Sequence, residues 1–438
     1  MRENIRTALI RAITESIRLI RDFSERFAEP HWTWTRNPNG GWNGSYEDRP
    51  SGFQVYLNTE QSMNEAAEDF WRLYREEYPE YGGMVGFRTT GRMSADRRPF
   101  VIPSSAVREL RRRYGSYDVP DTAVIGIVDE FADFLRNPVT RLRFSAQLIN
   151  FRSNLERIEL PGGLVIRRLD EREINEIYGG PITARNLALK NHFGILEYVI
   201  EGEFDEPKII GDDPDPPQKE NTVRQILDRA MLALRTFKEG RVGYDLIRFC
   251  SVRFCPWLMH GLTYGDLYVP FGVYEIAEDE ILKLREHAQL VIGLKESAMV
   301  TACSRLADAE TRSRPQDQII DAVIGMESIL LCGQNAELSY RFSMRYSSMF
   351  DRPEEKHRAY RVARDLYSLR SIIAHGDRIK KKTHRVGDED DLTLEEAAKR
   401  ATATLRQLIY RFLPSAVSAP YTNDPFWDRA IFGLPDPA

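Results

Sequence analysis

Apolar residues recur at helical spacing throughout the last third of the chain. The clearest case is residues 354–374, where Val362, Leu366, Leu369 and Ile373 are spaced four, three and four residues apart. That spacing produces one apolar stripe along a helix, which other helices must cover. Similar stripes predict further helices at 276–309 (one or two helices), 316–332, 336–350 and 394–413. Short loops join the four helices predicted at 316–332, 336–350, 354–374 and 394–413, which predicts a helical bundle.

The first 221 residues combine helical and strand patterns. Helical spacing predicts helices at 1–28, 60–78, 104–114 and 121–137. Alternation of apolar and polar residues then predicts strands at 141–151, 157–159 and 164–168, followed by a short acidic helix. Gly162 and Gly163 mark a hairpin turn before the last of these strands. An Asn-Gly-Gly break predicts a β-hairpin or an irregular loop within 31–58, and a strand pair is expected within 192–203.

Acidic residues and prolines dominate residues 203–221, so we place a domain boundary or an exposed loop there. A helix at 222–237 and an aromatic-rich stretch to residue 274 follow. Thr393, directly before the last predicted helix and after an acidic loop, is a candidate N-cap. We therefore expect a mainly α protein, α+β overall. Its expected parts are an α+β region at 1–221, a connecting region at 222–310, a helical bundle at 311–415 and a C-terminal tail at 416–438.

Composition and charge limit the classes of function. The 438 residues predict two or three domains, and the net charge of −5 means that any affinity for nucleic acid must come from local basic patches. Four cysteines show no CxxC pairing, so neither a disulfide framework nor a metal site is expected. The sequence has no signal-peptide pattern and no stretch of ~18 apolar residues, so we expect a cytoplasmic protein without a membrane span.

A run of arginines falls on the helix predicted for 104–114, namely Arg108, Arg111, Arg112 and Arg113. Such a run either holds phosphate groups or forms a solvated face with surface ion pairs. The second arrangement is the commoner one.

The signatures of several enzyme classes are absent: the sequence has no P-loop, no GxGxxG, no HExxH and no GxSxG. The strongest candidate site is Arg370 with His375, followed by Gly376, although an Arg/His spacing alone is not specific in an arginine-rich chain. At about 100° per residue, the two side chains leave one straight helix in different directions. They face one substrate only if the last turn unwinds at Gly376 or if a second copy of the chain supplies the partner, and the latter predicts a dimer. A structural role also stays open, because such residues cap the last carbonyl groups of helices.

Three stretches of the C-terminal region resemble the HEPN superfamily and, within it, the Apea-like branch. They are RPQDQIIDAVIGMESILL from Arg314, ELSYRFSMRYSSMF from Glu337 and LYSLRSIIAHGD from Leu366. Families of this type are four-helix bundles in which an Arg-x4-6-His motif serves a metal-independent ribonuclease site, usually assembled across a dimer. The resemblance therefore implies a HEPN-like four-helix bundle, a catalytic pair of Arg370 and His375, and neither metal nor cofactor.

The resemblance also assigns secondary roles. Ser371 stands where the ribonuclease motif usually has Asn, Asp or His. Further residues match recurring polar positions of this branch and are expected to orient or flank the site: Glu327, Glu337, Arg341, Arg345 and Tyr367. A basic run past the histidine either forms a solvated loop or supplies a local positive field for RNA; it consists of Lys380, Lys381, Lys382 and Arg385.

The chemistry of the two residue types fits this expectation. Histidine titrates near neutral pH and can take the proton of an RNA 2′-hydroxyl, while arginine binds two phosphate oxygens. By resemblance, we expect an endoribonuclease of bacterial anti-phage defence (abortive infection) or of toxin type. It would act as a homodimer on tRNA or single-stranded RNA and leave 2′,3′-cyclic phosphate and 5′-hydroxyl ends. The N-terminal region would sense a phage-derived trigger or restrain the bundle.

Two other functions stay open. In the first, the helical bundle binds a nucleotide, RNA or a protein partner without cleaving it. In the other, the N-terminal region holds an active site of its own.

Overall fold

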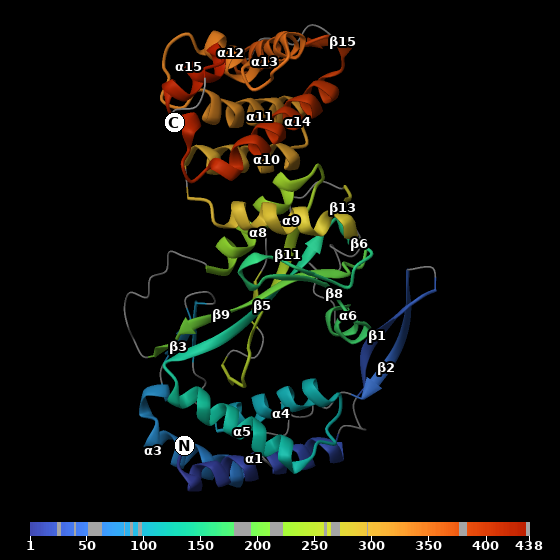
Figure 1. Ribbon diagram of the computed structural model, residues 1–438. Coiled ribbons are helices and arrows are strands. Elements are labelled where there is room, and N and C mark those ends of the chain that lie inside the picture. Colours follow the sequence, from blue (N-terminus) through green and yellow to red (C-terminus); the bar gives the residue numbers. More distant parts are fainter. Residues whose placement is uncertain are drawn as a thin grey trace. The chain divides into compact units, whose positions relative to one another are not determined.

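The computed structural model describes residues 1–23, 28–38, 41–50, 64–82, 84–87, 91–94, 99–178, 194–210, 222–257, 261–263, 272–295, 297–375 and 383–434. Within these residues the protein is mainly α-helical, with several small sheets and one larger one (Figure 1). It divides into two compact units. The first comprises Met1–Leu148, Gly163–Gln225 and Tyr244–Gly265, and the second comprises Ile149–Gly162, Ile226–Gly243 and Asp266–Ala438. The units thus interleave along the chain, unlike the consecutive domains expected from the sequence.

The first unit contains most of the strands. Its helices are α1 (Glu3–Phe23), α3 (Asn64–Glu77), α4 (Val101–Tyr114), α5 (Asp121–Arg136) and α6 (Glu171–Tyr178). Its strands are β1 (Ala28–Arg36), β2 (Trp42–Pro50), β3 (Met84–Phe87), β4 (Gly91–Ser94), β5 (Val139–Ile149), β8 (Val165–Arg168), β9 (Tyr198–Pro207), β10 (Ile209–Ile210), β11 (Gly243–Ser251) and β12 (Gly261–Thr263). The antiparallel pairing of β1 with β2 confirms the hairpin predicted within 31–58.

Four helices of the first unit, α1, α3, α4 and α5, pack around one apolar core. This core is formed by the apolar residues at helical spacing in these segments. Leu9 of α1, Phe70 of α3 and Phe131 of α5 are fully buried in it. Trp257, which follows β11, stacks on Tyr81 with ring centroids 5.6 Å apart. The core therefore joins the first helix of the chain to a segment some 250 residues later.

The main sheet of the first unit has the strand order β12-β11-β5-β9-β8. In the antiparallel pair of β5 and β9, Arg141 lies opposite Asp205 and Arg143 opposite Glu203. Both pairs form cross-strand ion pairs, at 2.8 Å and 2.9 Å between Nε and the carboxylate. Side chains alternate between the faces of a strand, so Leu142 points to the opposite face, where it joins the helical core.

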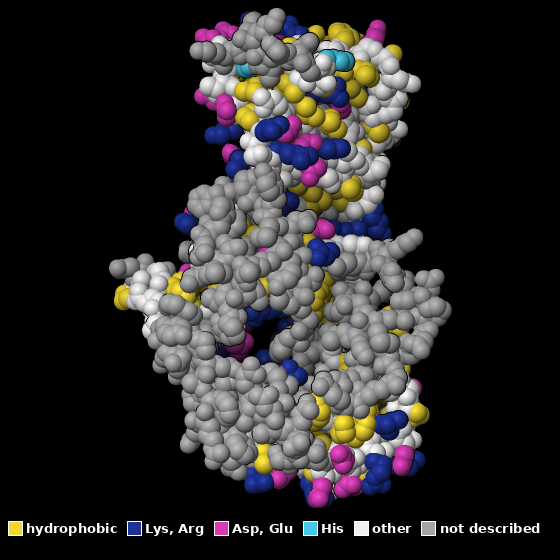
Figure 2. Space-filling model, turned by 180° about the vertical axis from the view of Figure 1, so that it is seen from behind, with side chains coloured by type: hydrophobic (Ala, Val, Ile, Leu, Met, Phe, Trp, Pro, Cys, Tyr) yellow, Lys and Arg dark blue, Asp and Glu magenta, His cyan; other side chains and the backbone are white. Residues whose placement is uncertain are grey.

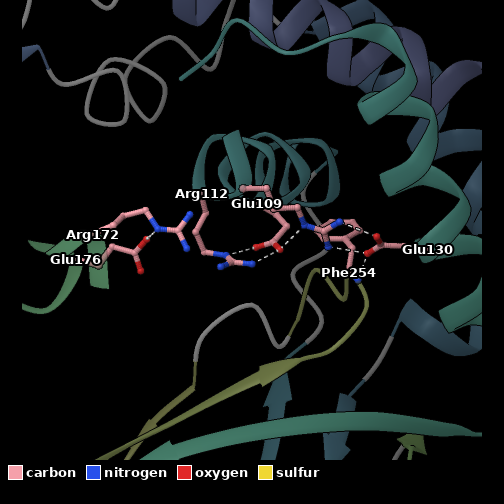
Figure 3. Close-up of polar contacts among 7 residues, drawn as sticks. Glu109, Arg112, Glu130, Arg172, Glu176 and Phe254 are labelled. Carbon is pink, nitrogen blue, oxygen red and sulfur yellow. Dashed lines mark hydrogen bonds and ion pairs between the residues drawn. The ribbon is translucent and has the colours of Figure 1, made fainter. Parts of the chain in front are cut away.

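The arginine run on α4 is paired with carboxylates. Arg112 and Arg113 both donate to Glu109, at 2.8 Å and 2.7 Å from their Nε atoms, and Arg113 also binds Glu130 of α5 through both Nη atoms (Figure 3). Burial acts to raise the pKa of Glu109, but these hydrogen bonds outweigh it and leave the pKa below its usual value. Glu130 also accepts the backbone N–H of Phe254 at 2.7 Å. This network ties α4 to α5 and to the segment after β11.

The second unit is mostly helical. Its helices are α8 (Thr222–Phe237, whose first turn belongs to the first unit), α9 (Ile281–Ile292), α10 (Ser297–Thr311), α11 (Pro315–Leu330), α12 (Leu338–Ser347), α13 (Pro353–Ala374), α14 (Leu394–Phe412) and α15 (Asp424–Phe432). Its strands are β6 (Phe151–Ser153), β7 (Arg157–Glu159), β13 (Tyr274–Ile276), β14 (His384–Val386) and β15 (Glu389–Leu392). None of the helices among the described residues is long and apolar enough to cross a membrane.

Helix α11 lies at the centre of the second unit and packs against α10, α12, α13 and α14. Its residues Ile319, Val323 and Met326 are completely buried. At Gly325, α11 and α14 come so close that an added Cβ would lie 2.6 Å from a methyl group of Leu405. A larger residue at this position would therefore push the two helices apart.

Several predicted elements differ from those observed. Residues 384–392, expected as an acidic loop, form the antiparallel hairpin β14–β15. The strand pair expected within 192–203 is the single strand β9, and residues 191–193 lie outside the described residues. The segment after 415, expected as a tail, contains α15, whose Trp427 is buried against Phe412. Pro420 and Pro425 argue against a helix in the sequence, because proline usually interrupts helices. Pro425, however, lies in the first turn of α15, where proline is well tolerated.

Histidine 287 of α9 is buried in the second unit. Its Nε2 lies 2.8 Å from the Thr236 hydroxyl of α8, and its ring packs against Phe237 and Tyr410. The Thr236 hydroxyl donates to the Leu232 carbonyl at 2.7 Å, so Nε2 carries the hydrogen and donates to Thr236. Burial, with a smaller effect of the Arg406 charge, lowers the pKa of His287 to about 4.

We expect His287 to make the second unit sensitive to acid. The unfolded chain binds a proton near pH 6.5, before the folded one does, so stability falls as the pH drops from about 6.5 towards 4, by roughly 3 kcal/mol. Urea unfolding of His287→Phe, which keeps an aromatic ring but cannot titrate, should show a correspondingly smaller loss between pH 7 and pH 4. Equal losses in the two proteins would show that His287 is not the titrating group.

Candidate functional site

Helix α13 carries the candidate catalytic pair. It begins at Pro353, with Glu354 and Glu355 in its first turn, where acidic residues favour the helix dipole. Its stripe residues Val362, Leu366 and Leu369 are buried, and the helix packs against α11 and α12. The apolar periodicity of the sequence therefore determines which face of α13 turns inward, and the remaining faces carry the polar residues.

Arg370 extends from α13 towards α11. Its Nη2 lies 3.3 Å from Oε2 of Glu327, and both side chains are partly buried. Its Nε is buried and has no hydrogen-bond acceptor among the described residues. Burial raises the pKa of Glu327, and the Arg370 charge only partly counters that rise. Among the described residues, Arg370 is thus held by one long contact to Glu327, and its buried Nε–H has no acceptor.

Tyr367 lies one turn before Arg370 on α13 and belongs to the same cluster. Its ring centroid is 5.2 Å from that of Phe342 on α12. Burial raises the pKa of Tyr367, the negative charge of Glu327 raises it further, and Arg370 opposes both. The structure therefore brings together three of the residues singled out in the sequence, Glu327, Tyr367 and Arg370, from α11 and α13.

His375 lies at the C-terminal end of α13 and is exposed. Its backbone N–H donates to the carbonyl of Ser371 at 3.0 Å, the ordinary hydrogen bond of a helical turn, which gives the Ser371 side chain no role of its own. The helix stays regular to Ala374, so the step of five positions from Arg370 to His375 separates the two side chains by roughly 140° about the helix axis. Within one chain, α13 does not unwind before the histidine and does not turn both side chains to one side.

The residues predicted on α12 have different surroundings. Glu337 is the exposed N-cap residue, in a left-handed conformation with φ of 54°, and its carbonyl accepts the N–H of Arg341 at 2.9 Å. The Nε of Arg341 is buried and has no partner among the described residues.

Arg345, by contrast, is only 3% exposed. It donates to the Leu330 carbonyl at 2.9 Å and to Asp424 at 2.6 Å, and it lies over the ring of Trp427. This guanidinium connects α12 to the end of α11 and to α15.

The basic run past the histidine is only partly described. Lys380, Lys381 and Lys382 lie outside the described residues. Arg385 on β14 is exposed; its Nε donates to the Gly387 carbonyl at 3.1 Å and lies 3.4 Å from Asp390. The acidic residues of the hairpin therefore offset part of the positive charge of Arg385.

Sequence reasoning missed the residues that attach this hairpin to α13. Asp365 accepts the backbone N–H of Gly387 at 3.0 Å. Gly387 has a φ of +69°, and an added Cβ would lie 2.5 Å from a methyl group of Val362, so only glycine fits there. In the sequence, the Val-Gly-Asp stretch at 386–388, between two short polar stretches, could have indicated the turn of this hairpin.

Comparison of the chain with protein-family models, with curated proteins and with solved structures finds no match.

Proposed function

We propose that this protein is a metal-independent endoribonuclease of the HEPN type that acts as a dimer. The observation that carries the proposal is the state of Arg370. Its guanidinium contacts Glu327 at 3.3 Å, its Nε has no acceptor among the described residues, and an exposed histidine follows the same helix. An arginine that binds phosphate oxygens and an accessible imidazole that takes a proton are, once brought together, the groups that metal-free phosphodiester cleavage needs.

In the proposed reaction, His375 takes the proton from the 2′-hydroxyl of a ribose as its oxygen attacks the adjacent phosphorus. Arg370 stabilises the negative charge that builds on the phosphate oxygens. The bond to the 5′-oxygen of the next nucleotide breaks, that oxygen receives a proton from water, and His375 returns to its neutral form by releasing its proton to the solvent. The products are a 2′,3′-cyclic phosphate and a 5′-hydroxyl. Tyr367 and Glu327 orient the Arg370 side chain.

The helix geometry supports the proposed dimer. Arg370 and His375 of one straight α13 point in directions roughly 140° apart. A second protomer related by a two-fold axis near the end of α13 brings its own histidine towards the arginine of the first. Each composite site then contains an arginine and a histidine from different chains.

The role that we propose for the whole chain is bacterial anti-phage defence or toxin-type RNA cleavage on tRNA or single-stranded RNA. The first unit would sense a trigger of phage origin or restrain the helical unit. A basic segment at 380–382 and Arg385 would supply local positive charge for RNA.

A non-catalytic binding module is the second candidate. It is favoured by the contact between Arg370 and Glu327, because an arginine engaged by a carboxylate competes less well for a transition-state phosphate. In that case the bundle would recruit a nucleotide, RNA or a protein partner without cleaving RNA.

Incubation of the purified chain with end-labelled tRNA and single-stranded RNA in the presence of EDTA tests the proposal. We expect cleavage, with 2′,3′-cyclic phosphate and 5′-hydroxyl ends identified by mass analysis of the fragments. Retention of intact RNA on the protein would support the binding module instead. Products with 5′-phosphate ends would contradict the proposed mechanism.

A further inference from the structure

A cavity of about 200 Å³ opens among α12, α13 and α14 of the second unit. None of its described lining residues belongs to the proposed ribonuclease site. Its floor consists of almost completely buried residues, namely Tyr346, Ala359, Val362 and Thr404. Three exposed residues lie at its rim, Arg358, Ala403 and Gln407. The cavity therefore connects a buried interior to the solvent.

The interior of the cavity is apolar and aromatic. The rings of Tyr346 and Phe350 meet edge to face, with their centroids 5.6 Å apart, and Ala359 and Val362 line the same space from α13. Aromatic rings pack favourably against further rings in offset or edge-to-face arrangements. An apolar cavity of about 150 Å³ takes up benzene. This cavity, of about 200 Å³, therefore has room for one aromatic ring with a substituent.

Neutral polar groups lie at one end of the cavity. The Tyr346 hydroxyl is 3.5 Å from Oε1 of Gln407, a long hydrogen bond. Gln407 and Arg400 both line the cavity from α14, and their positions in the chain place them about 10 Å apart along the helix axis. Arg400 therefore lies at the opposite end of the cavity.

Two arginines mark that opposite end. Nε of Arg358 lies 3.1 Å from Asp388, and Nη2 of Arg400 lies 3.5 Å from Glu389. Both guanidinium groups lie close to one turn, because Asp388 and Glu389 are neighbours in the β14–β15 hairpin, which packs on α13 and α14 (Figure 1). Arg361 also pairs with Asp388, so two arginines share that carboxylate. The side chains of Arg358 and Arg400 are 64% and 40% exposed, and ion pairs at such positions contribute little. A carboxylate on a ligand can therefore compete for both arginines.

The negative charge of the lining is already engaged. Glu355 is the only carboxylate among the described residues that line the cavity. Arg352 binds it, and this hydrogen bond lowers the pKa of Glu355, so the carboxylate stays ionised and paired. Figure 2 shows hydrophobic and basic side chains next to each other on the described surface of the second unit. The cavity thus offers a ligand an apolar interior with two cations at one end.

We propose that this cavity binds a small aromatic carboxylate, that is, a molecule with one six-membered ring and one carboxylate group. The ring occupies the apolar interior beside Tyr346, Phe350 and Val362. The carboxylate binds Arg358 and Arg400, because guanidinium groups form paired, charge-assisted hydrogen bonds with carboxylates. A neutral ring adds no partner for the arginines, and a small anion without a ring leaves the apolar interior unfilled. The proposal does not depend on the ribonuclease activity.

Ligand-observed NMR titrations of the full chain with benzoate, benzamide and acetate, at constant ionic strength, test the proposal. Benzoate carries both the ring and the charge, whereas benzamide lacks the charge and acetate lacks the ring. We expect benzoate to bind at least about tenfold more tightly than either of the others. The reason is that a hydrogen bond to a charged group and the burial of a ring each contribute about a factor of ten or more to affinity.

Two variants separate the contributions of charge and shape. Arg400→Gln should weaken benzoate binding about tenfold and leave benzamide binding unchanged, because it removes the charge at one end of the cavity. Ala403→Leu should weaken the binding of both ligands, because the larger side chain occupies part of the cavity. Leucine is a good helix former, so α14 should persist in this variant.

Arg411→Gln is the matched control, because Arg411 is an exposed arginine in the last turn of α14 and does not line the cavity. It should bind benzoate as tightly as the unmodified protein does, and thermal unfolding verifies that each variant is folded. An unmodified protein that does not bind benzoate, or that binds benzamide or acetate equally tightly, would overturn the proposal. So would a benzoate affinity that Arg400→Gln or Ala403→Leu leaves unchanged.

Discussion

Replacing His375 with alanine is expected to lower RNA cleavage about 10²- to 10⁴-fold, the range attributable to general acid–base catalysis. The fold should be unaffected, because the histidine is exposed and its backbone, rather than its imidazole, makes the contact with Ser371. The measurement is the single-turnover rate on labelled RNA in EDTA, with circular dichroism as a check of folding. His357→Ala is the matched control, since His357 is an exposed histidine on the same helix.

Mixing chains that carry Arg370→Ala with chains that carry His375→Ala tests the dimer. In a mixed dimer, one composite site keeps an intact arginine from one chain and an intact histidine from the other, so part of the activity should return. If the mixture is as inactive as its components, the arginine and the histidine do not come from different protomers. Cleavage by His375→Ala at the rate of the unmodified protein would remove the basis of the catalytic proposal.

Replacing Arg345 with alanine is expected to destabilise the second unit by about 4 kcal/mol. Three losses add up: a cavity remains at a position that is 3% exposed, the Leu330 carbonyl loses its donor, and α15 loses its attachment through Asp424. Urea unfolding measures the loss, and hydrogen exchange should show α15 opening first. Arg345 would then act as a structural residue of the bundle rather than as a residue that flanks the RNA.

Asp424→Asn is the control for the Arg345 prediction. It removes the negative charge but keeps an acceptor oxygen, and Asp424 is half exposed, so the expected loss is only about 1 kcal/mol. An Arg345→Ala variant of unchanged stability but reduced RNA cleavage would show that the guanidinium serves the substrate.

The sequence predicted the second unit well at the level of helices. Residues 222–237 form α8 with the predicted bounds, α13 ends at Ala374 as expected, and Thr393 caps α14 in a capping box with Glu396. These features depend on residues a few positions apart, whose spacing and side-chain hydrogen bonds act locally. The same reasoning failed for α15 and for the β14–β15 hairpin, because packing against other elements stabilises them more than their own residues do.

The candidate site was predictable only as a set of residue types. Arg370 and His375 stand out by their position at the end of a helix, and the resemblance to HEPN bundles gave them a role. That Arg370 meets Glu327 depends on the packing of α13 on α11, across 43 residues of sequence. The sequence predicted the same role for Arg345 as for Glu327, that of a residue flanking the site. Only the fold directs Arg345 towards Asp424 instead.

By itself, the sequence determined that this protein is mainly helical, which faces of its helices are apolar, and that α13 ends in an arginine and a histidine on different sides. Local periodicity and helix geometry suffice for these features. Only the tertiary structure decided how the chain segments are shared between two units, which arginines pair with carboxylates, and that Arg345 turns towards Asp424 while Arg370 meets Glu327. Those outcomes depend on contacts between residues far apart in the chain, and local pattern carries no information about them.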